Sequence, residues 1–155
     1  MGASIPKIAE ILDCTTPKAK AANDSFLDAF PELKRLKKIK IPNDAAKGYF
    51  VGLDGRKVIC NSEHLMLAGY LQNGEATIMK HATVKWMSKL NSTAIPYWLV
   101  DFVHDEWQTE TEDNANAHTV GKTQCWALEE VGKELNLFCP LAGKYSIGES
   151  WAQTH

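Results

Sequence analysis

Several features that mark common protein classes are missing from these 155 residues. The four cysteines stand far apart, with no Cys-x-x-Cys pair and no ladder of histidines near them. This argues against a zinc site or a disulfide framework and favours reduced thiols in a cytosol-like compartment. No apolar run approaches the roughly 18 residues that cross a bilayer, and the amino terminus lacks the basic and apolar regions of a signal peptide. We therefore expect a soluble cytoplasmic protein without a membrane partner.

Strong net charge is missing as well. The formal net charge is −2 and the pI is near 6.2, so bulk electrostatics do not indicate a nucleic-acid binder. Any phosphate binding must come from local basic patches or from a partner chain. One such patch is the run Lys34–Lys40, which is either a phosphate track or a solvated helix face; we favour the track. Hydrophobic residues make up 45% of the chain, which is ordinary for a globular unit with its own core.

The order of helical and alternating patterns predicts an α+β fold, with antiparallel strands and helices packed on one face. Asp54-Gly55 suits a tight primed turn, in which both central residues have positive φ. Ile41–Asp44 is expected to break the helical region before it. The expected elements are helices over 5–12, 17–30 and from Pro31 onward, a hairpin of 48–53 and 56–60, a helix over 63–90, a hairpin of 97–103 and 107–111, a helix from 113 or 114 to 136, and a last strand over 137–142.

The second hairpin carries two adjacent carboxylates, Asp105 and Glu106, at its tip. Phe102 and Val103 are expected to be buried before the turn, and Trp107 follows it, so the turn is expected to be rigidly mounted. Adjacent carboxylates repel each other unless a cation lies beside them, and Mg²⁺ is a hard ion that takes carboxylate oxygens. The alternative is a plain solvated turn.

Five segments together resemble family A DNA polymerases, the family of bacterial DNA polymerase I and of the replicative enzymes of short-tailed phages. The phage type is the closest match, and the resemblance spans essentially the whole chain. The third motif of that family is similar to Val103-His104-Asp105-Glu106. The other four segments are the hairpin Gly52–Val58, the helical series His64, Ala68 and Gln72, the ending Ser150–His155, and the start Gly2–Ala9, which resembles the stretch after the Tyr-Gly of the fingers helix.

The resemblance implies a role for each matching residue. Asp105 stands where the family has one of two metal-ligand aspartates, and Glu106 where it has an auxiliary carboxylate. His104 matches a residue that lies against the primer terminus. Gln72 matches a minor-groove donor, a role that fits the acceptors common to all base pairs. His64 lies on the same helical stripe as Gln72, and Arg56 and Lys57 are candidates for gripping primer phosphates or are exposed turn charges.

The family's other catalytic aspartate and its nucleotide-binding fingers helix have no counterpart in this chain. The resemblance therefore implies the carboxy-terminal subunit of a split DNA-directed DNA polymerase, with a fingers segment over 1–45 and the carboxy-terminal part of the palm over 46–155. A larger partner chain is expected to supply the remaining palm, the fingers helix and the thumb. The site would bind primer-template DNA, deoxynucleoside triphosphates and two Mg²⁺ ions, in a phage-infected bacterial cell. Alone, the chain is expected to be inactive and poorly soluble.

Two other functions remain open. One is a non-catalytic DNA-binding or regulatory relict of a polymerase palm, favoured by Ala68, which replaces the family's asparagine. The other is a metal-dependent nuclease that uses His104, Asp105 and Glu106, which lacks a further acidic cluster in the sequence.

Overall fold

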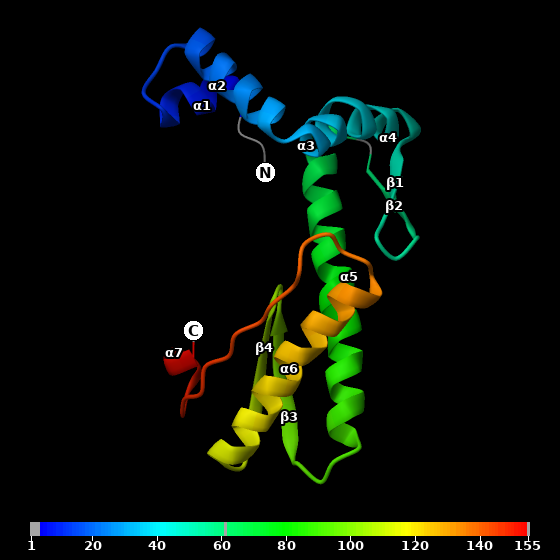
Figure 1. Cartoon of the computed structure of the whole chain (residues 1–155), viewed down its shortest axis with the longest axis vertical. Helices are drawn as coiled ribbons and strands as arrows, with labels where there is room; N and C mark the ends of the chain where they lie inside the picture. The colour runs from blue at the N-terminus through cyan, green and yellow to red at the C-terminus, as the bar shows by residue number, and fades with distance from the viewer. Residues whose placement is uncertain (1–3, 61, 155) are drawn as a thin grey trace. The chain divides into compact units, whose positions relative to one another are not determined.

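The computed structural model describes residues 4–60 and 62–154, in two compact units that divide after Gln72 (Figure 1). The elements of the first unit are α1 (Ile5–Ile11), α2 (Thr16–Ala29), α3 (Pro31–Arg35), the π-helical turn η1 (Leu36–Lys40), α4 (Ile41–Lys47), β1 (Tyr49–Val51) and β2 (Lys57–Ile59). Helix α5 (Glu63–Asn91) begins in this unit and continues into the second, which adds β3 (Tyr97–Val103), β4 (Glu106–Thr111), α6 (Asn114–Glu134) and α7 (Trp151–Thr154). The expected α+β class is confirmed, and no described helix is long and apolar enough to cross a membrane.

The first three helices begin where the sequence predicts, because prolines stand at their first turns, where the missing N–H is not needed. The expected break at 41–44 is wrong, since the chain stays helical from Leu36 through Lys47. The Ile41 N–H donates to the Leu36 carbonyl, five residues back. This wider turn precedes Pro42, whose ring clashes with the carbonyl four residues back in a regular α-helix. Gly48 then ends α4 with φ of 77°.

The first hairpin is confirmed, but its turn differs from the expected type. β1 and β2 pair antiparallel, with Tyr49 opposite Ile59. Gly55 has φ of 78°, whereas Asp54 is not among the residues with positive φ. The Gly55 N–H donates to the Gly52 carbonyl at 3.0 Å, and the Gly52 N–H donates to the Arg56 carbonyl at 2.8 Å. The loop therefore has three residues and closes on a left-handed glycine, a common alternative to the two-residue primed turn.

Each unit has its own hydrophobic core. In the first, Phe50 stacks on Tyr70 with ring centroids 4.2 Å apart, and Ile41 and Met66 are buried around them. In the second, Trp86 of α5 lies at the centre and contacts the rings of Tyr97 and Trp107 edge-on. The buried hydrophobic residues of α5 there, Met79, Ala82, Trp86 and Leu90, are spaced by three or four, as the helical pattern predicts.

Helix α6 is capped by a side chain at its first turn and by backbone hydrogen bonds at its last turn. The Asp113 carboxylate accepts from the Asn116 N–H at 2.7 Å, as expected for an N-cap. At the other end Asn136 has φ of 52°, and the Leu137 N–H donates to the Gly132 carbonyl while the Asn136 N–H donates to that of Lys133. These two bonds form a Schellman motif, which ends the helix near the expected residue.

The expected last strand over 137–142 is wrong, because these residues are not in a strand. The chain instead runs extended along α6. Leu141 packs beside Gly132, Gly143 lies against Cys125, and the Tyr145 ring covers Gly121. Alternate residues of this segment thus face α6. A strand in a sheet and an extended segment on a helix both bury every second residue, so the sequence pattern is the same for both.

The strands form two separate two-stranded sheets among the described residues, rather than one larger palm sheet. The residues of β3 are also more exposed than expected. Phe102 and Val103 are 37% and 40% exposed, and Trp98 and Val100 are more than half exposed. One face of the β3–β4 hairpin packs on Trp86, and much of the apolar surface on its other side is uncovered in this chain.

Candidate active site

The acidic turn lies between β3 and β4 in a two-residue loop, His104-Asp105, because Val103 pairs directly with Glu106. His104 has φ of 51°, and Asp105 is not among the residues with positive φ. A positive φ at the first loop residue alone is typical of a type II′ turn, which normally has glycine there. A histidine in this position is strained, and such strain is concentrated at functional sites.

The hairpin that presents this turn is firmly mounted on α5. Trp107, the residue after Glu106, donates from Nε1 to Thr83 Oγ1 at 2.8 Å, and its ring packs against Trp86. Phe102 lies opposite Trp107 on the other strand, with ring centroids 6.1 Å apart. Trp107 therefore anchors the hairpin to α5, whereas the expected burial of Phe102 and Val103 is wrong.

The two carboxylates of the turn have different surroundings. Asp105 is exposed at the tip. Glu106 is half-buried, and its Oε1 accepts a hydrogen bond from the Gln108 side-chain amide. The Thr154 hydroxyl of α7 lies 3.4 Å from the Gln108 amide oxygen and closer, at 3.1 Å, to the Trp151 carbonyl oxygen, which competes for its single proton. The sequence does not reveal these two partners, because an isolated Gln or Thr on a strand or helix carries no signal of what it contacts.

The oxygens of Asp105 and Glu106 are donors of the kind that Mg²⁺ takes. No group of three or more His, Cys, Asp or Glu residues that could hold a metal ion occurs in the described part of the chain.

The other candidate residues lie in the first unit. His64 and Gln72 are exposed on α5, two steps of four residues apart, so they share a stripe of the helix. Arg56 is exposed and binds the Asp54 carboxylate, with Nε 2.6 Å from Oδ2. This hydrogen bond lowers the pKa of Asp54 and raises that of Arg56. Lys57 Nζ lies 4.9 Å from the centre of the Tyr49 ring.

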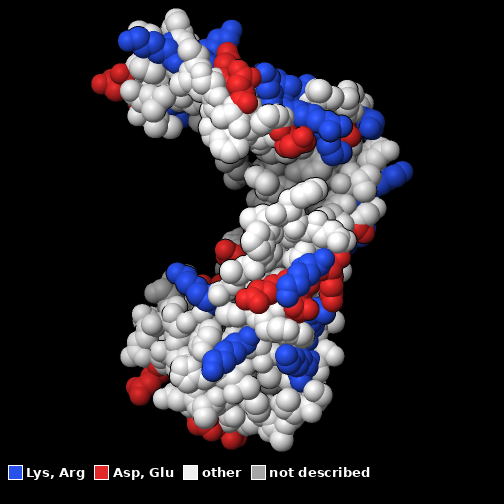
Figure 2. All heavy atoms as spheres, in the orientation of Figure 1, with Lys and Arg blue, Asp and Glu red and all other residues white. Residues whose placement is uncertain are grey.

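The basic run Lys34–Lys40 spans the end of α3 and all of η1, and Lys47 follows at the end of α4. Lys and Arg side chains gather over these elements (Figure 2). Lys34 pairs with Asp28, with 2.5 Å between Nζ and Oδ1. Lys40 and Lys47 both pair with Asp44. For Arg35, Lys37 and Lys38 no ion pair is found with a described residue.

Asp44 is a buried carboxylate that the sequence analysis did not single out. It accepts from the Tyr70 hydroxyl at 2.5 Å and from Lys40 at 3.0 Å and Lys47 at 3.2 Å. These bonds, that from Tyr70 foremost, hold the pKa of Asp44 at about 2. An Asp within a lysine-rich stretch would have hinted at pairing, but its burial depends on α5, which follows later in the chain.

No protein-family model matches the chain. A DNA-directed DNA polymerase of Escherichia phage Phieco32 is 31% identical over 126 residues, which cover 75% of this chain and 20% of that protein. The DNA-directed DNA polymerases of Enterobacteria phage T3 and Escherichia phage T7 are 27% and 28% identical, and each match covers 99% of this chain and 25% of the relative. The chain is homologous to phage DNA polymerases. The resemblance found in the sequence is thereby confirmed.

A solved structure gives the same result for the fold. The POL domain of Pol1 from M. smegmatis, in complex with DNA primer-template and dNTP, matches 84% of this chain with a TM-score of 0.73 and 17% identity. The match covers 25% of that chain. The polymerase homologue described here thus spans about a fifth to a quarter of the length of the proteins it matches.

Proposed function

We propose that this chain supplies one metal-ligand aspartate, Asp105, to a DNA-directed DNA polymerase site that is completed by a second, larger chain. The observation that carries the proposal is the exposed carboxylate at a strained, well-mounted turn, in a chain homologous to phage DNA polymerases. The partial donor set supports a shared site, because two carboxylates are too few to hold two ions.

In this proposal each residue of the turn has its own task. Asp105 holds a divalent ion, Glu106 serves as the auxiliary carboxylate beside it, and His104 lies against the primer terminus. Bound Mg²⁺ ions would stabilise the attacking and leaving oxygens of nucleotidyl transfer. The positive φ of His104 fixes the direction in which the imidazole and the adjacent carboxylate leave the hairpin.

The first unit would hold the primer-template. Gln72 and His64 lie on one stripe of α5 and supply hydrogen bonds that do not depend on sequence, as minor-groove contacts do. Arg56 and Lys57 would bind phosphates, with Arg56 exchanging its bond to Asp54 for a phosphate oxygen. Ala68 occupies the same stripe without a polar group. In this proposal residues 1–45 form the fingers segment and residues 46–155 form part of the palm. The protein would act in the cytoplasm of the infected bacterium.

The test is primer extension by the chain co-expressed with the large polymerase chain expected in the neighbouring reading frame. Asp105→Asn should lower extension by about a thousandfold, because a metal ligand is lost, while assembly and DNA binding remain. Glu112→Gln is the matched control, since Glu112 is an exposed carboxylate seven residues away. Undiminished extension by Asp105→Asn would refute the assignment.

A non-catalytic DNA-binding module is the second candidate, favoured by the incomplete donor set of the described residues. Titration calorimetry with primer-template distinguishes the two functions. If the site is catalytic, divalent ions should strengthen the binding of primer-template by the complex, and Asp105→Asn should abolish this effect of the ions. A DNA-binding relict should bind equally with and without Mg²⁺, and its complex should extend no primer.

A further inference from the structure

A charged groove of about 470 Å³ follows one side of the continuous helix formed by α3, η1 and α4. Arg35, Lys40 and Lys47 line it with cations, and Glu32 and Asp44 line it with carboxylates. Three cations against two carboxylates leave one positive charge in the groove. The groove is therefore a narrower feature than the basic run of the sequence, because only part of that run lines it and Lys47 lies beyond the run.

The π-helical turn η1 brings the two ends of the groove onto one side of the helix. Arg35 precedes this turn and Lys47 follows it, twelve residues after Arg35. At about 100° per residue a regular α-helix would set these two side chains roughly 120° apart around its axis, whereas the extra residue taken up by a π-turn reduces the angle to about 20°. Such turns are rare and are often found at functional sites.

The two lysines of the groove are held in place by one buried carboxylate. Asp44 accepts from Lys40 Nζ at 3.0 Å and from Lys47 Nζ at 3.2 Å, and the Tyr70 hydroxyl of α5 also donates to it. Asp44 is only 6% exposed, whereas the side chains of Lys40 and Lys47 are more than half exposed. An ammonium group has three donors, so each lysine keeps at least one N–H for an anion in the groove.

Arg35 supplies the third cation. No ion pair is found between Arg35 and a described residue, whereas the neighbouring Lys34 pairs with Asp28. A guanidinium has five donors in a planar fork that fits the oxygens of a phosphate. The single positive charge of the groove matches a phosphodiester, which carries one negative charge, better than a terminal phosphate, which carries nearly two.

We propose that this groove binds one backbone phosphate of the primer-template through Arg35, Lys40 and Lys47. The proposal rests on the proposed function for the identity of the DNA. The groove adds to the contacts proposed for the first hairpin and for α5, because none of its three cations belongs to them. A phosphate contact carries no sequence information, so the groove would position the DNA on the first unit without selecting its sequence.

The test is fluorescence anisotropy of labelled primer-template with the co-expressed complex over a range of salt concentrations. Arg35→Met combined with Lys47→Met should weaken binding about tenfold at low salt, because charged hydrogen bonds to a phosphate are lost. The slope of log K against log salt should become shallower by about 0.9, the value for one phosphate. Arg35→Lys combined with Lys47→Arg keeps both charges and should bind as wild type.

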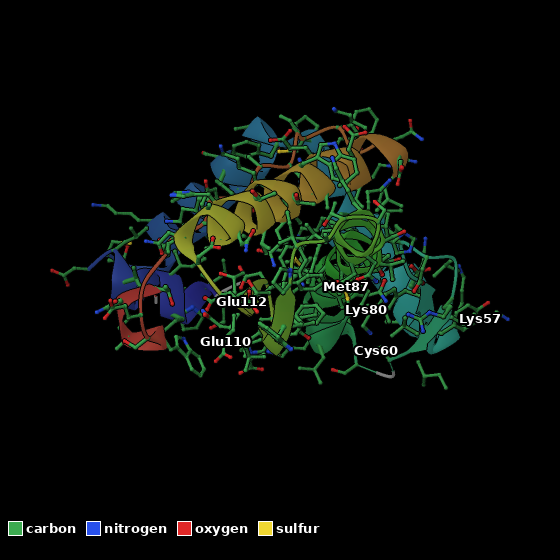
Figure 3. The ribbon with its side chains drawn as sticks, turned by 90° about the horizontal axis from the view of Figure 1, so that it is seen from below. Lys57, Cys60, Lys80, Met87, Glu110 and Glu112 are labelled. Carbon is green, nitrogen blue, oxygen red and sulfur yellow. The ribbon has the colours of Figure 1, made fainter. Side chains whose placement is uncertain are left out.

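The control is Lys80→Met, which should leave the slope unchanged. Lys80 is an exposed lysine on the part of α5 that belongs to the second unit (Figure 3). An unchanged slope in the double methionine variant would overturn the proposal. A slope shallower by about 1.8 would overturn it as well, because two separate phosphates would then lie along a solvated helix face.

Two further measurements on the double methionine variant exclude other ligands. A raised KM for the incoming nucleotide with unchanged affinity for DNA would assign the groove to a triphosphate and overturn the proposal. Failure to assemble with the large chain would assign it to an acidic segment of that chain, with the same consequence.

The two proposals fail in different ways. If the proposed function is wrong, Asp105→Asn keeps full extension. If only this inference is wrong, Asp105→Asn is inactive and the double methionine variant binds primer-template with the salt dependence of wild type.

Discussion

At the scale of single residues, the chain places charged groups in two contrasting settings. Asp105 is exposed at a turn, where its charge is stabilised by water and is available to a ligand. Asp44 is buried and has three hydrogen-bond donors around it, so its charge is satisfied within the protein and serves stability. Exposure and partners, rather than residue type, therefore separate the candidate catalytic aspartate from the structural one.

The Asp44 network predicts a specific dependence of stability on pH. The pKa of Asp44 is lowered from its ordinary value of 3.8 to about 2 in the folded chain. The folded state therefore binds the proton of this carboxyl less tightly than the unfolded state does. The stabilisation is therefore complete above about pH 4 and is lost as the pH falls towards 2. Asp44→Asn should lower the free energy of unfolding by about 1–2 kcal/mol at pH 7 and by little at pH 2.

Urea unfolding of wild type and variant at both pH values measures this difference. Asp28→Asn is the control, because Asp28 is an exposed carboxylate paired with Lys34, and such pairs contribute little. An equal loss at pH 7 and pH 2 would show that Asp44 acts through packing alone.

At the scale of elements, the packing of the extended segment 137–148 on α6 depends on Gly121, which has no side chain in the way. A Cβ at Gly121 would lie 2.5 Å from the Tyr145 ring, whereas one at Gly132 would lie 3.1 Å from the Leu141 side chain. The first approach is too short for any side chain and involves a rigid ring, and the second can be relieved by a small shift of a leucine.

Gly121→Ala should therefore displace Tyr145 from α6 and destabilise the chain by about 1–3 kcal/mol. Gly132→Ala should have a smaller effect, of either sign, because alanine also favours the helix. Thermal unfolding compares the two, and hydrogen exchange of residues 141–147 reports the displacement. Equal exchange in Gly121→Ala and wild type would contradict the predicted displacement.

Most elements could be predicted from the sequence, because helix period, proline positions and the Asp113 cap are local signals. The failures have physical causes that are not local. The π-helical turn before Pro42 depends on a change of helical pitch. The extended segment depends on contacts with residues of α6 that are distant in the sequence. At the site, the sequence predicted the turn and the stripe of His64 and Gln72. Gln108 and Asp44 were missed because a polar residue acquires its role from its contacts.

At the scale of the whole molecule, the β3–β4 hairpin exposes apolar surface. Trp98 and Val100 are 53% and 58% exposed on β3, and both edges of the two-stranded sheet lack a paired strand among the described residues. Such a surface favours association with another chain. In the proposed function, the rest of the polymerase covers it.

We expect the chain alone to self-associate through this surface. Trp98→Ser with Val100→Ser should raise the monomer fraction in sedimentation velocity, because both substitutions remove exposed apolar area. Val84→Ser is the control, since Val84 is 70% exposed on α5 and lies outside the hairpin. Co-expression with the large chain should also suppress association. A monodisperse wild-type monomer would argue against obligate pairing.

The positive φ of His104 also has a stereochemical consequence. A φ of 51° is unfavourable for an L-amino acid but natural for its mirror image. Exchange of L-histidine for D-histidine at this one position would relieve the backbone and keep an imidazole, but the imidazole would leave the turn in a different direction. Cys60 and Cys125 bracket the turn and provide ligation junctions for a synthetic middle segment. The exchange keeps the turn and the imidazole group but changes where the imidazole points, which separates the direction of this side chain from its chemistry.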